Sequence, residues 1–324
     1  MEFVSISEAG VAALRGCALL SSDSAPELDH VTLAGRSMLL ASLFAGHDLQ
    51  RGDVVALLSE HTTGVYEFLV GVRRAGLVLM VLDPAHTLEQ LAFAINTSGA
   101  FVVVASTGQQ ATAQALVSLT PYIRARYGLD ADFPDHRSLP LARSAAPVRV
   151  VDAAPSGTLH HVIGPSHRPV EIRLPDPVDD ALGRAHAREL FGDVELGPDT
   201  VLVGSAPVLS TVAAQLGTAV LARRGGVAVP RRPTGVEVLR TAFAVDATVL
   251  HLTSDAAIEI IGLGADRVLR LSPPGLALVV VDGAGCSAPV RRALGDLWGP
   301  LVRVVEPAYL QLEESDCSVT QAEI

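Results

Sequence analysis

The sequence predicts an α/β protein built as two lobes, each a mainly parallel sheet flanked by helices. Apolar runs of strand length alternate with amphipathic helical segments in both halves of the chain. Hydrophobic residues make up 49% of the 324 residues, and the mean hydropathy is +0.39. The apolar runs, such as Leu276–Val281, are too short to cross a bilayer, which takes roughly 18 residues or more. Buried parallel strands therefore account for the hydropathy better than membrane spans do.

The first half of the chain alternates between helical and extended patterns. Residues Thr32–Ala45 have the apolar spacing of a helix and end beside a glycine. The next segment, Leu49–Ser59, reads as a turn followed by a buried strand. A helix with a glycine stop, a strand with an Asp-Pro turn, and a further helix and strand follow. These later elements are predicted over Thr63–Gly76, Leu77–Leu82, Thr87–Thr97 and Phe101–Ala105.

The middle of the chain lacks this regularity. Residues Tyr122–Ser156 are rich in Pro, Asp, Arg and Ala with weak periodicity, which predicts a long surface connection or a lobe boundary. We expect the first lobe at residues 1–150, a link at residues 151–175 and the second lobe at residues 176–324. In the second lobe, strands are predicted over Asp199–Gly204, Gly226–Pro230, Thr248–Leu252, Ala277–Val281 and Val302–Val305, and helices over Ser210–Arg223, Gly235–Ala244, Ser254–Ile261 and Ala288–Trp298.

Composition excludes several classes of function. The net charge of −11 argues against nonspecific binding to nucleic acid, because phosphates require clustered cations. The cysteines Cys17, Cys286 and Cys317 give neither a disulfide framework nor a metal pattern, and the N-terminus lacks the basic start of a signal peptide. We therefore expect a reduced, cytoplasmic protein. The chain contains no lysine, so all 24 basic residues are arginine and no lysine-dependent step can be completed by this chain.

Three blocks of sequence, in this order, carry a resemblance to known enzymes. The first, LQRGDVVALLSEHTTGVYEFLVGVRRAG, places a Gly-Asp-x-Val strand before a helix and an Ala-Gly turn. The second begins LGPDTVLVGSAPVLS, and the third is LALVVVDGAGCSAPVRRALGDLW. Together they resemble the adenylate-forming superfamily of acyl-CoA synthetases, nonribosomal peptide adenylation domains and luciferases. The resemblance runs from about Thr32 to Ser315, and it implies the fold of the large N-terminal domain of acyl-CoA synthetases.

The phosphate loop is the clearest departure from that family. Relatives have a glycine-rich loop ending Gly-x-Pro-Lys-Gly, whose backbone N–H groups and lysine hold the ATP phosphates. Here, within HVIGPSHRPVEIRL, the loop is reduced to Gly164, Ser166 and Arg168. Val170 stands where the lysine is expected, and Glu171 replaces the last glycine and repels a triphosphate. The resemblance therefore implies a degenerate loop that no longer supports adenylation.

The resemblance also implies a relic nucleotide site. Gly283 and Ala284 occupy the turn that approaches adenine, although any tight strand-to-helix turn would use the same residues. Tyr309 would stack on adenine and Glu313 would ligate magnesium, but the Gly and Thr of the family's Tyr-Gly-x-Thr-Glu motif are both Leu here. Packing without a nucleotide is the alternative role for these two residues. No cofactor is expected, and ATP or AMP with magnesium would bind weakly, only if the relic site persists.

Two further absences are expected. The family continues with a C-terminal domain that carries the catalytic lysine, and this chain ends shortly after Glu313, so we expect that domain and any catalytic residue to be absent. The histidines His160, His161, His167 and His186 are close in sequence, but their spacing does not match a structural zinc site. We interpret them as surface or loop residues and expect no metal.

Three functional hypotheses remain open from the sequence. The first is a non-catalytic acyl-CoA synthetase-like protein, or pseudoenzyme, which binds an active ligase, an acyl or peptidyl carrier, or a second copy of itself as a homodimer. The second is one subunit of a split ligase that another polypeptide completes. The third is a new reaction in the old acyl pocket, for which the sequence offers no clear pair of nucleophile and base. No nucleic-acid partner and no membrane span are expected.

Overall fold

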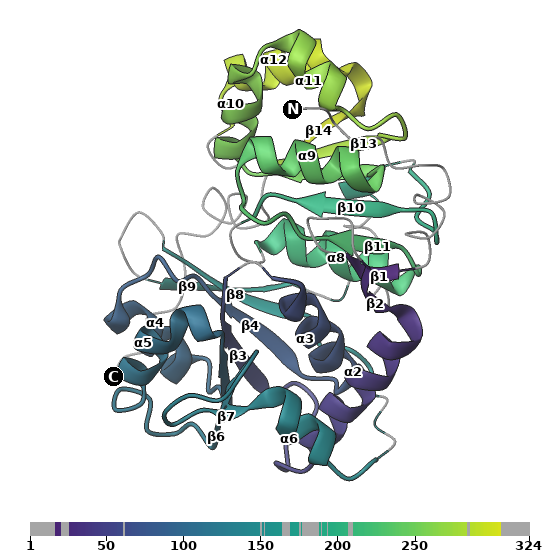
Figure 1. Ribbon diagram of the computed structural model, residues 1–324. Helices are drawn as coiled ribbons and strands as arrows, with labels where there is room; N and C mark the ends of the chain where they lie inside the picture. Colours follow the sequence, from purple (N-terminus) through teal and green to yellow (C-terminus); the bar gives the residue numbers. More distant parts are fainter. Residues whose placement is uncertain are drawn as a thin grey trace.

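The computed structural model describes residues 17–20, 26–60, 62–149, 151, 153–163, 169–174, 176, 188, 190–192, 194–206, 210–283 and 286–305. Within these residues, two seven-stranded sheets and their helices form five layers (Figure 1). Helices cover the outer face of each sheet, and a shared helical layer lies between the sheets. The predicted α/β fold with two mainly parallel sheets is confirmed. No helix in this part of the chain combines the length and apolar character that a bilayer crossing requires.

The first sheet is parallel except at one edge. Its strand order is β7-β6-β5-β3-β4-β8-β9, and β9 runs antiparallel to β8. The central strands are apolar and buried along their whole length, as expected for strands that are covered on both faces. The strands are β3 (Val54–Leu58), β4 (Val78–Leu82), β5 (Val102–Ala105), β6 (Ala125–Gly128), β7 (Arg137–Ser138), β8 (Thr158–Ile163) and β9 (Pro169–Leu174).

The second sheet repeats this arrangement, with its edge supplied by the N-terminal segment. Its order is β14-β13-β12-β10-β11-β1-β2, with β1 parallel to β11 and β2 antiparallel to β1. Strands β1 and β2 therefore lie in the second sheet, although they fall within residues 1–150 of the chain. The strands are β10 (Val201–Gly204), β11 (Gly226–Ala228), β12 (Val249–Leu252), β13 (Leu278–Asp282), β14 (Val302–Val305), β1 (Cys17–Leu20) and β2 (Pro26–Asp29).

Both sheets are wound in two directions from a central pair of strands. In the first sheet the chain passes from β3 to β4 on one side and then crosses to β5 on the other. In the second sheet it passes from β10 to β11 and then crosses to β12. The connections that leave each central pair diverge, and such a switch point opens a crevice at the carboxyl ends of the strands. Each sheet therefore has one such switch point among its described strands, at β3/β5 and at β10/β12.

The outer helices begin at polar side chains that cap their first turns. Thr87 and Gln90 form a capping box at the start of α4, and the Thr234 and Thr253 hydroxyls accept hydrogen bonds from the first turns of α9 and α10. The outer face of the first sheet is covered by α4 (Leu88–Thr97) and α5 (Gln110–Leu116), with the 3-10 turn η1 (Thr107–Gln109) before α5. The second sheet is covered by α9 (Gly235–Val245), α10 (Ser254–Gly262), α11 (Ala265–Leu271) and α12 (Ala288–Trp298), followed by η2 (Gly299–Leu301).

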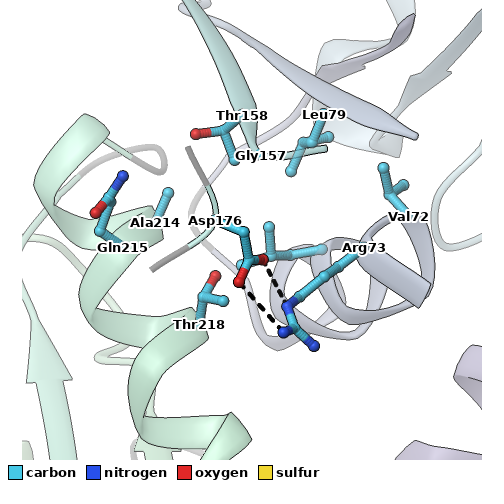
Figure 2. Close-up of a pocket in the computed structure, with 10 residues that line it drawn as sticks. Val72, Arg73, Leu79, Gly157, Thr158, Asp176, Ala214, Gln215 and Thr218 are labelled. Carbon is cyan, nitrogen blue, oxygen red and sulfur yellow. Dashed lines mark hydrogen bonds and ion pairs between the residues drawn. The ribbon is translucent and has the colours of Figure 1, made fainter. Parts of the chain in front are cut away.

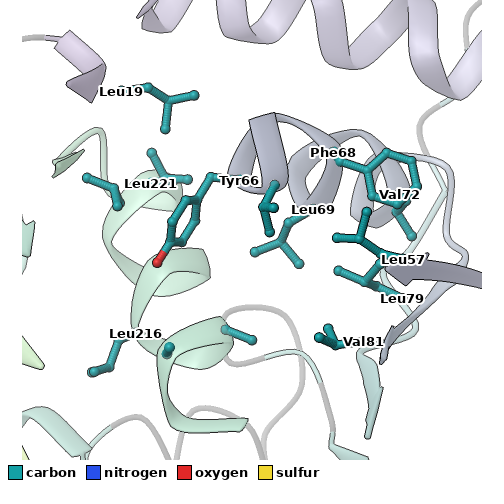
Figure 3. Close-up of a cluster of buried hydrophobic side chains, with 14 of the residues drawn as sticks. Leu19, Leu57, Tyr66, Phe68, Leu69, Val72, Leu79, Val81, Leu216 and Leu221 are labelled. Carbon is teal, nitrogen blue, oxygen red and sulfur yellow. The ribbon is translucent and has the colours of Figure 1, made fainter. Parts of the chain in front are cut away.

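The inner layer holds the two sheets together. It consists of α2 (His30–Ala45), α3 (Thr63–Arg74), α6 (Leu139–Ala145) and α8 (Thr211–Ala222). Every residue of α8 from Thr211 to Leu221 is buried, which is the pattern of a helix packed on all sides. Tyr66 of α3 is 1% exposed and points at α8, where a methyl group on Gly217 would overlap its ring (Figure 3). Burial raises the pKa of Tyr66.

The structure corrects one segment of the sequence prediction. Residues Tyr122–Ser156, expected as a surface connection, contain β6, β7 and α6. Strand β6 is short, and its Arg126 donates hydrogen bonds to the backbone carbonyl and the hydroxyl of Thr120, which gives this buried strand a polar appearance in sequence. Helix α6 starts at Ser138, whose hydroxyl accepts from the Leu141 N–H. Short elements with one polar face leave too weak a periodicity to detect.

We expect Gly217→Ala to destabilise the protein by about 1–3 kcal/mol, because the added methyl overpacks the contact between α8 and Tyr66. Gly35→Ala in α2 is the control, since no atom lies within 4 Å of its added methyl. Removing a helical glycine there should stabilise by about 0.5–1 kcal/mol. Urea unfolding of both variants measures the difference, and equal effects of the two substitutions would contradict the packing argument.

Candidate functional site

The structure describes few of the residues predicted for the relic site. Gly283 lies directly after β13, at the carboxyl edge of the second sheet. The other predicted residues, Gly164, Ser166, Arg168, Ala284, Tyr309 and Glu313, lie outside the described residues. The roles assigned to these seven residues from the sequence therefore stay predictions.

The two strands beside the predicted phosphate loop form an antiparallel hairpin. Strand β8 pairs with β9 in a register that sets Ile163 opposite Pro169, and β8 also pairs in parallel with β4. The backbones of Val170 and Glu171 belong to β9, opposite Val162 and His161. The two residues that depart most from the family motif thus lie in a strand.

The turn at Gly283 is closed by backbone hydrogen bonds. The Gly283 N–H donates to the Val305 carbonyl at 2.7 Å, and the Cys286 N–H donates to the Gly283 carbonyl at 2.9 Å. Arg291 of α12 donates from Nε to the Cys286 carbonyl at 2.9 Å. These hydrogen bonds connect the carboxyl ends of β13 and β14 with the start of α12, at the carboxyl edge of the second sheet.

A small pocket lies between the two lobes, at the contact of α3 with α8 (Figure 2). Its centre is the ion pair of Arg73 with Asp176, in which Nε donates to Oδ2 at 2.7 Å and Nη2 donates to Oδ1 at 3.2 Å. The Asp176 side chain is 5% exposed and that of Arg73 24% exposed. The remaining walls are formed by Leu69, Val72, Leu79, Gly157, Thr158, Ala214, Gln215 and Thr218.

The space in this pocket is close to that of one water molecule, too small for a nucleotide or an acyl chain. Two parallel hydrogen bonds between a guanidinium and a carboxylate are the strongest arrangement of this ion pair. They compensate the cost of removing both charges from water. Because Arg73 comes from α3 and Asp176 follows β9 beside α8, the pair joins segments far apart in the chain. Because β9 is a strand of the first sheet, the pair fixes the segment after β9 against α3, where both face α8.

A histidine and an aspartate that sequence reasoning missed meet at the carboxyl edge of the second sheet. His251 of β12 is 0% exposed, and its Nε2 lies 3.1 Å from Oδ1 of Asp282, the last residue of β13. Next to them, the Ser205 hydroxyl accepts from the Thr253 N–H at 2.7 Å. The sequence signal was a histidine inside the apolar run Val-Leu-His-Leu, but no pattern could show that Asp282 lies on the neighbouring strand.

The corresponding edge of the first sheet carries a carboxylate. Glu60, which follows β3, accepts hydrogen bonds from the Ser106 hydroxyl and from Gln109 Nε2, the latter at 2.8 Å. Burial acts to raise the pKa of Glu60, but these hydrogen bonds outweigh it and the pKa is lowered. Within the described residues, no three His, Cys, Asp or Glu side chains come together as a metal site at either edge.

Comparison with known proteins tests the family resemblance. The family model described as AMP-binding enzyme matches residues 20–171, a range that includes the first six strands of the first sheet and the start of β9. The resemblance to AMP-binding enzymes is confirmed. The matched range contains the predicted phosphate loop, so the departures at Val170 and Glu171 lie inside the AMP-binding match.

Solved structures and one curated relative extend the comparison. The chain superimposes on a protein assigned as a long-chain-fatty-acid CoA ligase from Rhodopseudomonas palustris with a TM-score of 0.72 at 18% identity, covering 91% of this chain and 72% of that one. The amide bond synthetase McbA from Marinactinospora thermotolerans gives 0.72 at 18% identity, covering 91% and 58%. Malformin synthetase mlfA from Aspergillus sclerotiicarbonarius is 34% identical over 93 residues, 29% of this chain.

The overlap with these proteins is partial. The chain spans 2% of the malformin synthetase and 58% of McbA. At 18% identity the solved structures establish the fold alone, which is that of the large N-terminal domain of adenylate-forming ligases. The fold expected from the three sequence blocks is therefore confirmed.

We expect Asp176→Asn to destabilise the protein by about 2 kcal/mol, because it leaves a partly buried guanidinium with a weaker partner. Glu237→Gln is the matched control, since it breaks a more exposed ion pair with Arg240 on the surface of α9 and should cost about 0.3–0.5 kcal/mol. Thermal and urea unfolding compare the two. A cost for Asp176→Asn no larger than for the control would show that the pair does not stabilise the contact of α3 with the segment after β9.

Proposed function

We propose that this chain is a non-catalytic acyl-CoA synthetase-like protein that acts as a binding or assembly partner. The observation that carries the proposal is the absence of lysine from the chain, combined with Val170 and Glu171 at the phosphate-loop position. Adenylation depends on positioned cations and backbone donors around the phosphates. The chain keeps the fold of the family and lacks these elements in its sequence.

The closed lobe interface supports the same function. Tyr66 fills the contact with Gly217, and Arg73 pairs with Asp176 beside it, so the space between α3 and α8 is reduced to the size of a water molecule. Both lobes pack on one shared helical layer, so we expect them to keep a fixed relative position. The outer surface of the protein would then keep one shape. Such a surface suits a protein that binds other proteins.

Apolar side chains on the outer face of the first sheet support association. Phe93 of α4 is 50% exposed and Tyr122, after α5, is 81% exposed. Leu119 is also exposed, and its carbonyl accepts from Asn96, one turn along α4 from Phe93. Exposed apolar residues that lie close together are typical of interaction surfaces. We propose a second copy of this chain, an active ligase or an acyl carrier as the partner.

The names of the similar proteins give the proposal its setting. They include a fatty-acid CoA ligase, an amide bond synthetase and a peptide synthetase. We propose that the chain works in acyl, lipid or natural-product metabolism in the cytoplasm. A split ligase is the second candidate, and the sequence resemblance supports it, because it assigns the turn at Gly283 as the family's adenine contact.

We expect the purified chain to release no pyrophosphate from ATP and magnesium with acetate, octanoate or benzoate, because nothing replaces the missing lysine and phosphate loop. Pyrophosphate release is measured by a coupled phosphate assay. Isothermal calorimetry with ATP and magnesium alone is the second measurement. Pyrophosphate release would overturn the proposal, and ATP binding without release would favour the split ligase.

If the partner is a second copy, we expect the molar mass measured by light scattering to rise with protein concentration. The double variant Phe93→Asp with Tyr122→Asp should lose this rise. Charges at these positions should oppose burial of the patch. Ile258→Asp is the matched control, because Ile258 is 51% exposed on α10 and covers the other sheet. A strict monomer in the unsubstituted protein would leave a ligase or carrier as the proposed partner, and equal effects of both variants would argue against this surface.

A further inference from the structure

The pocket between α3 and α8 brings together polar side chains that are buried deep in the protein (Figure 2). Thr158 of β8, Asp176 after β9, and Gln215 and Thr218 of α8 line it, and each is at most 8% exposed. Strand β8 belongs to the first sheet, while α8 packs against β10 and β11 of the second. Because a buried polar group is stable only when it is hydrogen-bonded, the partners of these side chains decide what the pocket holds.

The charged residues of the pocket balance each other. Both carboxylate oxygens of Asp176 accept a hydrogen bond from the Arg73 guanidinium. The opposite charges of the pair cancel, so it attracts neither a metal ion nor an anion. A carboxylate has about four lone-pair positions, so Asp176 can accept a further hydrogen bond from a neutral donor.

Two hydroxyl groups beside this pair have no hydrogen-bond partner among the described residues. They belong to Thr158, which is 8% exposed, and to Thr218, which is 6% exposed. The Thr158 side chain points from β8 toward α8, and the Thr218 side chain points from α8 toward Asp176 (Figure 2). Each hydroxyl can donate one hydrogen bond and accept others. The pocket therefore presents two hydroxyls and a carboxylate to a single small space.

The size of that space selects the ligand. It is close to that of one water molecule, and apolar side chains of α3 and β4 close its other side, including Leu69, Val72 and Leu79. A water molecule is neutral, donates two hydrogen bonds and accepts up to two. It can donate to the Asp176 carboxylate and to one threonine hydroxyl, and accept from the other. Buried waters in proteins make about three such hydrogen bonds.

We propose that this pocket is a binding site for one ordered water molecule, held by Thr158, Thr218 and Asp176. The water connects a strand of the first sheet, the segment after β9 and the helix that packs on the second sheet, so it links the two lobes. The site involves neither ATP nor a partner protein. It therefore stands independently of the non-catalytic role proposed above.

A double-mutant cycle with Thr158→Val and Thr218→Val tests whether both hydroxyls bind the same water, because valine keeps the shape of threonine and removes its hydroxyl. Each single variant should lower the folding equilibrium constant, measured by urea unfolding, by about fivefold, the loss expected for one hydrogen bond. Since either substitution already disrupts the shared water, the double variant should lose clearly less than the about 25-fold that independent effects would give.

Thr241→Val is the matched control for the cycle. Thr241 is 2% exposed on α9, which covers the outer face of the second sheet, and it does not line the pocket. Combined with Thr158→Val, it should give additive effects, because the two sites share no partner. Additivity of Thr158→Val with Thr218→Val, or stabilisation by either of them, would overturn the proposal.

A high-resolution crystal structure of the full chain gives the direct measurement. We expect one ordered water within hydrogen-bond distance of both threonine hydroxyls and of the Asp176 carboxylate, and its loss or displacement in Thr218→Val. A structure in which the two hydroxyls bond only to protein atoms would overturn the proposal.

Discussion

The architecture depends on the contact between α3 and α8, the helices that both sheets share. Neither sheet has a complete inner face without them, because one core cluster draws side chains from both sheets and from these helices. The two helices approach closely only because position 217 is glycine and leaves room for the Tyr66 ring. The Arg73–Asp176 pair lies beside the same contact and lines the small pocket there. Lobe packing and the closed interface therefore have one common cause.

The two sheets have the same strand topology with different chemistry at equivalent points. Each sheet has a doubly wound set of parallel strands. At one edge, a parallel strand is followed by an antiparallel one: β8 and then β9 in the first sheet, and β1 and then β2 in the second. At the first switch point the chain supplies its own hydrogen-bonded carboxylate. At the second it leaves a buried imidazole nitrogen beside a glycine. The two sheets therefore share a topology but differ in the side chains at their switch points.

The fold of this chain and the sequence of its phosphate-loop position depend on different residues. The buried strands and the inner helices preserve the family architecture at 18% identity to solved ligases, since a core needs apolar side chains of suitable volume more than particular ones. The backbones of Val170 and Glu171 lie in strand β9, and β8 keeps its parallel pairing with β4. The fold therefore tolerates large changes of sequence at the phosphate-loop position.

The sequence by itself determined the α/β class, most helices and strands, and the family resemblance, because these depend on local apolar periodicity and on blocks of adjacent residues. It did not reveal β6, β7 and α6, whose short polar faces have no clear period. Only the tertiary structure decided that β1 and β2 join the second sheet, that Arg73 meets Asp176, and that His251 meets Asp282. Each of these joins residues distant in the chain, and strand order in a doubly wound sheet is set by packing between layers, which no local pattern records.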